Sequence, residues 1–266
     1  MEKKKNIAWF PEIRLDTISS VQLLQLSSRL KKANAEAIVL AGNISQQDLP
    51  INDLQMLEMY AGMPIYYVLG VDDFGGKSIK QVKASARSLS TKNVAWLGNR
   101  VIKLSNNSCL IGSSCLGDGQ LGKKEDTKFF LNSYCKIKDF KELTSSDIIS
   151  ELQKYASKSV KATEKVLLKA LKKYKNVVLT TPVPAYAENT IKDGNEMNEH
   201  MLAFCVCKSL GDMLTAVMDK YPDSKLTIIS GFVKTSTTYS PTDNIVSVTG
   251  INHDVLDDIQ NIVEVS

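Results

Sequence analysis

Short apolar runs alternate with amphipathic stretches over the first seventy residues. The apolar runs at 6–10, 37–41 and 63–69 have the length and composition of strands. The run at 37–41 is continuously apolar, which is typical of a strand buried on both faces. Apolar positions at helical spacing predict helices over 20–32 and 54–61. Such alternation indicates an α/β domain with central, partly parallel sheets.

The rest of the chain continues with more strands. Three short apolar runs at 94–97, 101–104 and 109–112 are separated by Gly-Asn and Asn-Asn pairs, which predict consecutive hairpins. Further along, the pattern predicts helices at 148–175 and 202–221 and strands at 177–180, 226–231, 244–248 and 262–265. Neither a Pro/Gly/Ser-rich linker nor an internal repeat interrupts this order, so we expect a single domain over residues 1–266.

Composition restricts the class of protein further. With 266 residues, of which 43% are apolar, the chain can bury a sizeable core without disulfides or metals. The net charge is +4, from 33 basic and 29 acidic residues, which is too small and too scattered to indicate nucleic-acid binding. No run of 18 apolar residues occurs, which argues against a membrane-spanning helix. The first apolar run ends at Phe10 before Pro11, so we expect no secretion signal and a cytoplasmic location.

Cysteine and histidine are sparse. The five cysteines show no Cys-x-x-Cys spacing and are expected to be buried free thiols. The two histidines, His200 and His253, cannot form a His-rich metal centre, and neither lies at the end of a predicted strand. The Gly-Gly-Lys-Ser stretch at 75–78 lacks the first glycine of a phosphate loop, so we interpret it as a chance match.

In α/β folds, chemistry gathers in the loops that follow the buried strands. Five such loops carry glycine, proline or polar residues here, at 11–14, 42–45, 70–73, 181–184 and 231–234. They are the candidate functional positions of this chain.

These loops resemble the sequence blocks of the calcineurin-like metallophosphoesterase superfamily. Residues 38–45 (IVLAGNIS) are similar to its block LAGDIS, and 66–74 (YYVLGVDDF) to YYVLGNHDF. Residues 181–186 resemble THVPPF, 226–234 resemble LTVLCGHTH, and the loop within 111–122 resembles a GDGRLG loop of one bacterial branch. The order is kept over nearly the whole chain. The resemblance therefore implies a four-layer α/β/β/α sandwich with two central mixed sheets.

The positions that carry the family's chemistry have changed. The aspartate and histidine of the first block are matched by Glu12 and Arg14. The aspartate that bridges the two metals is matched by Asn43. In the third block, Val71 stands for the metal-binding asparagine and Asp72 for the general-acid histidine.

The later blocks have changed in the same way. Their histidines fall on Pro182, Phe232 and Lys234. Asp73 matches an aspartate that braces its loop in the family, so we do not assign it a catalytic role. The resemblance thus implies a fold whose catalytic residues are absent, as in a pseudophosphatase.

Paired divalent ions need ligands with free lone pairs. The side chains of Val71, Pro182 and Phe232 offer none, while Arg14 and Lys234 each bring a permanent cation to the region of the ions. We therefore predict that both metals of the family are lost. The alternative is that Glu12 and Asn43, which are both oxygen donors, bind a Mg²⁺ or Ca²⁺ ion weakly.

Two interpretations of the altered crevice follow from its charges. Arg14 and Lys234 pair with Glu12, Asp72 and Asp73 in an ionic plug, or they form a small anion site for a phosphate or a phosphorylated ligand.

The predicted function is that of a catalytically inactive metallophosphoesterase-like protein that binds a partner protein or a phosphorylated ligand. The alternative is residual or altered phosphoesterase activity, with Glu12, Asn43 and Asp73 holding a metal or with Arg14 and Lys234 acting as electrophiles. A third hypothesis is an interaction role unrelated to the crevice, such as a mixed dimer with a homologous enzyme. Two surfaces are candidates for partners or oligomer contacts: the lysine-rich helix at 148–175, and the neighbourhood of Phe232 with Tyr186 and Tyr239.

Overall fold

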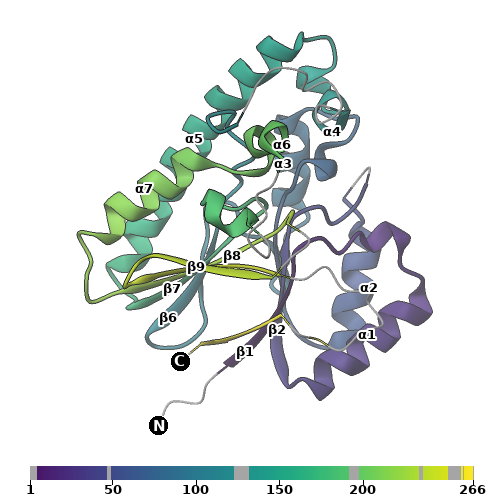
Figure 1. The fold of residues 1–266 in the computed structure, drawn as a ribbon. Helices are drawn as coiled ribbons and strands as arrows, with labels where there is room; N and C mark the ends of the chain where they lie inside the picture. Colours follow the sequence, from purple (N-terminus) through teal and green to yellow (C-terminus); the bar gives the residue numbers. More distant parts are fainter. Residues whose placement is uncertain are drawn as a thin grey trace.

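Two β-sheets pack face to face at the centre of the molecule, with helices on both outer sides (Figure 1). The structure is a computed structural model, and it describes residues 5–46, 49–122, 132–191, 198–233, 236–250, 259 and 261–265. The first sheet has the strand order β11-β1-β2-β3-β4 and the second has the order β5-β6-β7-β8-β10-β9. Both sheets are mixed. The expected four-layer α/β/β/α sandwich is confirmed.

The first sheet is built mostly from the N-terminal part of the chain. Its parallel strands are β1 (Lys5–Phe10), β2 (Ala35–Ala41), β3 (Ile65–Val68) and β4 (Val94–Trp96), and β11 (Ile262–Val265) joins β1 antiparallel. Helices α1 (Ser20–Lys32), α2 (Ile51–Ala61) and α3 (Ile79–Ser88) connect these strands. The predicted alternation of strands and helices is confirmed here. The chain also contains α3, for which the sequence analysis made no prediction.

The second sheet contains the C-terminal strands. It is formed by β5 (Val101–Lys103), β6 (Ser108–Gly112), β7 (Asn176–Thr181), β8 (Lys225–Ser230), β10 (Ile245–Thr249) and β9 (Thr237–Thr242). Strands β6, β7, β8 and β10 are parallel. Helices α4 (Asn132–Cys135), α5 (Ser145–Leu171), α6 (Glu199–Cys205) and α7 (Lys208–Met218) belong to this half of the chain. The edge strand β9 was not expected from the sequence.

Strand β2 shows how the layers divide the core. Ile38 and Leu40 pack with α1, α2 and α3 on the outer side of the first sheet, whereas Val39 and Ala41 pack between the two sheets. Both faces of the strand are buried, which is why its sequence is apolar without alternation. A third cluster fills the space between the second sheet and helices α5 and α7.

The prediction of consecutive hairpins at 94–112 was wrong in its first half. Strand β4 lies in the first sheet, parallel to β3, whereas β5 and β6 form an antiparallel pair in the second sheet. The turn at Gly98 and Asn99 therefore carries the chain from one sheet to the other. Local turn chemistry does not distinguish such a crossing from a hairpin.

The helix predicted over 202–221 is broken into α6 and α7, which meet at an angle of 60°. At the break, Val206 is extended, and the N–H of Cys207 donates to the carbonyl of Pro184 over 2.9 Å. The carboxylate of Asp118 accepts the N–H of Ser209 over 2.7 Å and so caps the start of α7. The interruption is thus stabilised by partners that are distant in sequence.

No single helix among the described residues is long and apolar enough to cross a membrane. The five cysteines are free thiols, and all except the half-buried Cys135 are buried, as the sequence predicted. His200 lies in the first turn of α6, while His253 lies outside the described residues.

Candidate functional site at the strand ends

The carboxyl ends of strands from both sheets meet at one place. A Cβ added to Gly231, which follows β8, would lie 2.5 Å from the carbonyl oxygens of Ala41 and Pro11 and 3.0 Å from that of Pro182. A Cβ on Gly70 would clash with the side chain of Asn43. The loops after β1, β2, β3, β7 and β8 therefore converge, as the resemblance implied, and glycine is what permits the close approach.

Three residues of these loops adopt a backbone conformation that L-residues rarely take. The φ angles are 49° at Arg14, 47° at Asn43 and 71° at Phe232. Such conformations persist only where the surrounding structure enforces them. Here the N–H of Arg14 donates to the carbonyl of Asn43 over 3.2 Å, and the N–H of Leu15 donates to that of Ile44 over 2.6 Å. The first two loops are thus tied together by their backbones.

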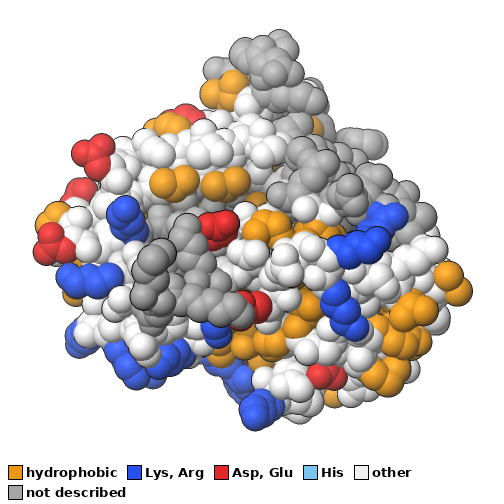
Figure 2. Space-filling model, turned by 90° about the horizontal axis from the view of Figure 1, so that it is seen from below, with side chains coloured by type: hydrophobic (Ala, Val, Ile, Leu, Met, Phe, Trp, Pro, Cys, Tyr) orange, Lys and Arg blue, Asp and Glu red, His pale blue; other side chains and the backbone are white. Residues whose placement is uncertain are grey.

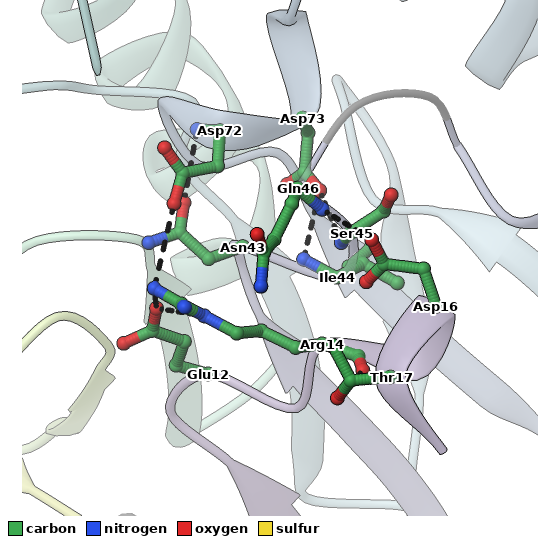
Figure 3. Close-up of polar contacts among 10 residues, drawn as sticks. All are labelled: Glu12, Arg14, Asp16, Thr17, Asn43, Ile44, Ser45, Gln46, Asp72 and Asp73. Carbon is green, nitrogen blue, oxygen red and sulfur yellow. Dashed lines mark hydrogen bonds and ion pairs between the residues drawn. The ribbon is translucent and has the colours of Figure 1, made fainter. Parts of the chain in front are cut away.

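Arg14 lies between two carboxylates (Figure 3). Its Nε donates to Glu12 Oε1 over 2.6 Å, and its terminal Nη2 pairs with the same oxygen. Nη2 also lies 3.7 Å from Asp72 Oδ2. The side chain of Glu12 is only 7% exposed, while that of Arg14 is 42% exposed. One fixed cation therefore offsets part of the charge of these two carboxylates.

Asn43 and Asp73 fasten the second loop to the third. Asn43 Oδ1 accepts the N–H of Asp72 over 3.2 Å. The Asp73 carboxylate accepts three backbone N–H groups, from Ile44 at 2.7 Å, Ser45 at 3.1 Å and Gly70 at 2.7 Å. Asp73 is 1% exposed. Its oxygens point into the loops and away from the ion pair of Arg14 (Figure 3), so this residue holds the loops together without facing the ion pair.

Loss of solvent raises the pKa of Asp73 to about 7. The three backbone N–H groups act in the opposite direction, and the nearby charge of Asp72 adds to the rise. Burial therefore favours the protonated, uncharged form of this carboxyl, while its hydrogen bonds favour the ionised form.

The remaining candidate positions are apolar or lie outside the described residues. Val71 is buried in the core beneath the first sheet, and Pro182 is buried at the end of β7. Phe232 is half-buried and packs against the clusters under both sheets. Lys234, which was expected beside Arg14, lies outside the described residues, so its predicted position remains a prediction.

These residues do not fit a pair of divalent ions. The described residues contain no group of three His, Cys, Asp or Glu side chains arranged to hold a metal. Glu12 and Asp72 already face the guanidinium of Arg14, and Asp73 is occupied by three N–H donors. Metal ligands need free lone pairs directed at the ion. We therefore derive no chemical step through metal ions here.

Sequence reasoning missed the tight packing of the loops at Gly231 and Gly70. The signal was the glycine that directly follows each buried strand, but its meaning depends on which other chain segment approaches it. The buried hydroxyls of Thr180 and Thr181 at the end of β7 were also not anticipated; neither has a hydrogen-bond partner within the described residues.

Two mixed sheets pack face to face and are covered by helices, and comparison with solved structures assigns this arrangement to the calcineurin-like metallophosphoesterase fold. No protein-family model and no curated protein sequence matches the chain. The fold is found instead by comparison with solved structures.

Three solved structures illustrate the similarity. The phosphopantetheinyl hydrolase of Mycobacterium tuberculosis has a TM-score of 0.58 at 9% identity, and the match covers 95% of this chain and 92% of that one. A dimetal phosphatase from Danio rerio has a TM-score of 0.54 at 9% identity, covering 92% and 86%. TT1561 of Thermus thermophilus has a TM-score of 0.53 at 13% identity, covering 98% of both chains. Identities this low support a shared fold and nothing finer.

Proposed function

We propose that this protein is a catalytically inactive member of the fold and that it acts by binding. The observation that carries the proposal is the ion pair of Arg14 with Glu12 and Asp72 at the converging strand ends. A guanidinium is permanently charged, so it repels divalent ions and occupies the carboxylates that they would need. The two metals of the family are accordingly proposed to be lost.

Metal content and hydrolysis test this proposal directly. The purified protein, dialysed against Mn²⁺ or Zn²⁺ and then against metal-free buffer, is expected to retain no stoichiometric metal in elemental analysis. It is also expected to show no turnover of a generic phosphomonoester or phosphodiester above the buffer rate. Two retained ions per chain would contradict the proposal, as would turnover that disappears in Glu12→Ala or Asn43→Ala. Asp223→Asn, a change at an exposed residue, serves as the control variant.

Residual hydrolysis remains the alternative in that experiment, although the contacts give it less support. Glu12 faces Arg14, the side-chain oxygen of Asn43 accepts one backbone N–H, and the carboxylate of Asp73 accepts three. Each proposed oxygen donor therefore already has a partner. A carboxylate with satisfied lone pairs is a poor metal ligand and a poor general base.

A phosphate site at Arg14 and Lys234 is the second candidate for binding. Arg14 is partly exposed, which favours access, but its two carboxylate neighbours give this trio a net negative charge. Anion binding here would therefore depend on Lys234. Isothermal titration with inorganic phosphate is expected to show the same weak or undetectable affinity in wild type and Arg14→Ala. A tenfold loss in the variant would establish the anion site instead.

Exposed surface supports a protein partner. Val21 and Leu24 of α1 and Met59 of α2 are exposed, and hydrophobic side chains gather on that side of the molecule (Figure 2). The outer face of α5 offers exposed lysines, among them Lys161 and Lys165. Apolar and basic surfaces of this kind are used in protein contacts. Co-purification from the native host, with quantitative mass spectrometry, would identify such a partner.

A further inference from the structure

A cavity of about 460 Å³ lies away from the converging strand ends, between α3 and α5. Its base includes Trp96 at the end of β4, the turn at Gly98 and Asn99, and Gly112 at the end of β6. The helix covering the first sheet and the helix covering the second therefore meet over it. Its volume is in the range of small-molecule sites. None of the candidate positions at the strand ends is among its described lining residues.

The lining is strongly basic. It contains five cationic side chains against two carboxylates, and these are Lys80, Lys83, Arg87, Lys154 and Lys158 against Asp139 and Glu151. Glu151 pairs with Lys154 over 2.7 Å, and Asp139 accepts the N–H of Ile79 over 2.6 Å. Within the described part of the chain, the other four cations have no carboxylate within ion-pair distance. The cavity thus concentrates uncompensated positive charge.

Lys83 is the most deeply placed of these cations. Burial lowers the pKa of its ammonium to about 8, with an opposing effect of Cys115. Its Nζ lies 4.5 Å from the centre of the Tyr155 ring, so the ammonium lies over an aromatic face. A half-buried ammonium with no counter-ion is what an anionic ligand would stabilise.

Aromatic side chains provide the second component. Trp96 and Tyr155 both line the cavity, and the guanidinium of Arg87 lies 5.9 Å from the Trp96 ring. Trp96 is 7% exposed, and its indole N–H has no hydrogen-bond partner among the described residues. This nitrogen is itself buried, so it is not open to the cavity. The aromatic rings therefore offer a ligand ring a surface to stack on.

We propose that this cavity binds a small phosphorylated molecule that carries a flat ring, such as a nucleotide. The four unpaired cations suit the charge of a phosphate ester, and the aromatic side chains of Trp96 and Tyr155 suit a flat ring. The inference does not depend on the loss of catalysis proposed above. It places a phosphorylated ligand at the seam between α3 and α5 and not beside Arg14.

Equilibrium titration of the full chain tests the proposal, with AMP, ADP, adenosine and inorganic phosphate as separate probes. Trp96 and Trp9 are the two tryptophans, so their fluorescence reports binding. ADP is expected to bind at least tenfold more tightly than adenosine or phosphate alone, and its affinity is expected to fall as salt rises. No binding of either nucleotide at millimolar concentration would overturn the proposal. So would equal affinity for phosphate and ADP.

Matched variants locate the site. Lys83→Gln and Arg87→Gln are each expected to weaken ADP binding at least tenfold, while Lys165→Gln, on the exposed face of α5, leaves it unchanged. Unaltered circular dichroism and Tm show that each variant folds. Loss of binding in Arg14→Ala with full binding in Lys83→Gln would move the ligand to the strand ends and overturn this inference. Tighter binding of a single-stranded oligonucleotide than of ADP would also overturn it, in favour of nucleic acid.

Discussion

Replacing Gly231 with alanine is expected to destabilise the protein by about 3 kcal/mol or more, at the upper end of overpacking effects. The added methyl group would lie 2.5 Å from the carbonyl oxygens of Ala41 and Pro11. Those oxygens belong to the backbone, at the last residue of β2 and directly after β1, so neither can move away as a flexible side chain would. Relief requires the two sheets to move apart at the strand ends. Urea unfolding followed by circular dichroism measures the loss, which corresponds to roughly 10 °C in Tm.

Gly62→Ala is the matched control. Gly62 ends α2 with a φ of 67°, but an added Cβ there would meet no atom within 4 Å. Only the backbone preference of a left-handed residue is lost, at about 1–2 kcal/mol. A Gly231→Ala variant that is no less stable than Gly62→Ala would show that the loops at the strand ends do not pack tightly against Gly231.

Much of the fold was readable from the apolar pattern because burial on both faces of a strand leaves a continuous signature. The run ending at Ala41 predicted β2, and Ser20 to Lys32 predicted α1 to the residue. The local sequence does not determine the sheet to which a strand belongs. Gly98 and Asn99 would suit a hairpin, yet they connect two sheets because Trp96 pairs with Tyr67 on β3. The break at Val206 likewise depends on a distant carbonyl.

The candidate site was predictable in part. Its positions followed from the strand-end loops and the family resemblance, and the charges of Glu12, Arg14 and Asp72 suggested an ionic plug. Which of these groups pair depends on loop backbones such as the left-handed Arg14, which no spacing encodes. The cavity between α3 and α5 could not be predicted, because its lining comes from segments spread over residues 79–163.

Two physical effects act on the pKa of Asp73 in opposite directions. Burial disfavours its charge, whereas the N–H groups of Ile44, Ser45 and Gly70 stabilise it. With the pKa raised to about 7 in the folded state from 3.8 in the open chain, the native protein binds more protons than the unfolded one between those values. Stability contributed by this group is therefore fully present below about pH 4 and is lost as pH rises through 7.

Asp73→Asn is expected to remove that dependence, since the amide does not titrate. The stability of the wild type relative to Asp73→Asn should fall between pH 4 and pH 8, by at most about 4 kcal/mol at about 1.4 kcal/mol per pKa unit. Urea unfolding at several pH values measures the difference, and the exposed Asp223→Asn should track the wild type throughout. If the difference instead grows with pH, the three N–H groups outweigh burial and the pKa of Asp73 is depressed. The direction in which this stability difference changes with pH thus decides whether burial raises the pKa of Asp73 or its carboxylate remains an anion.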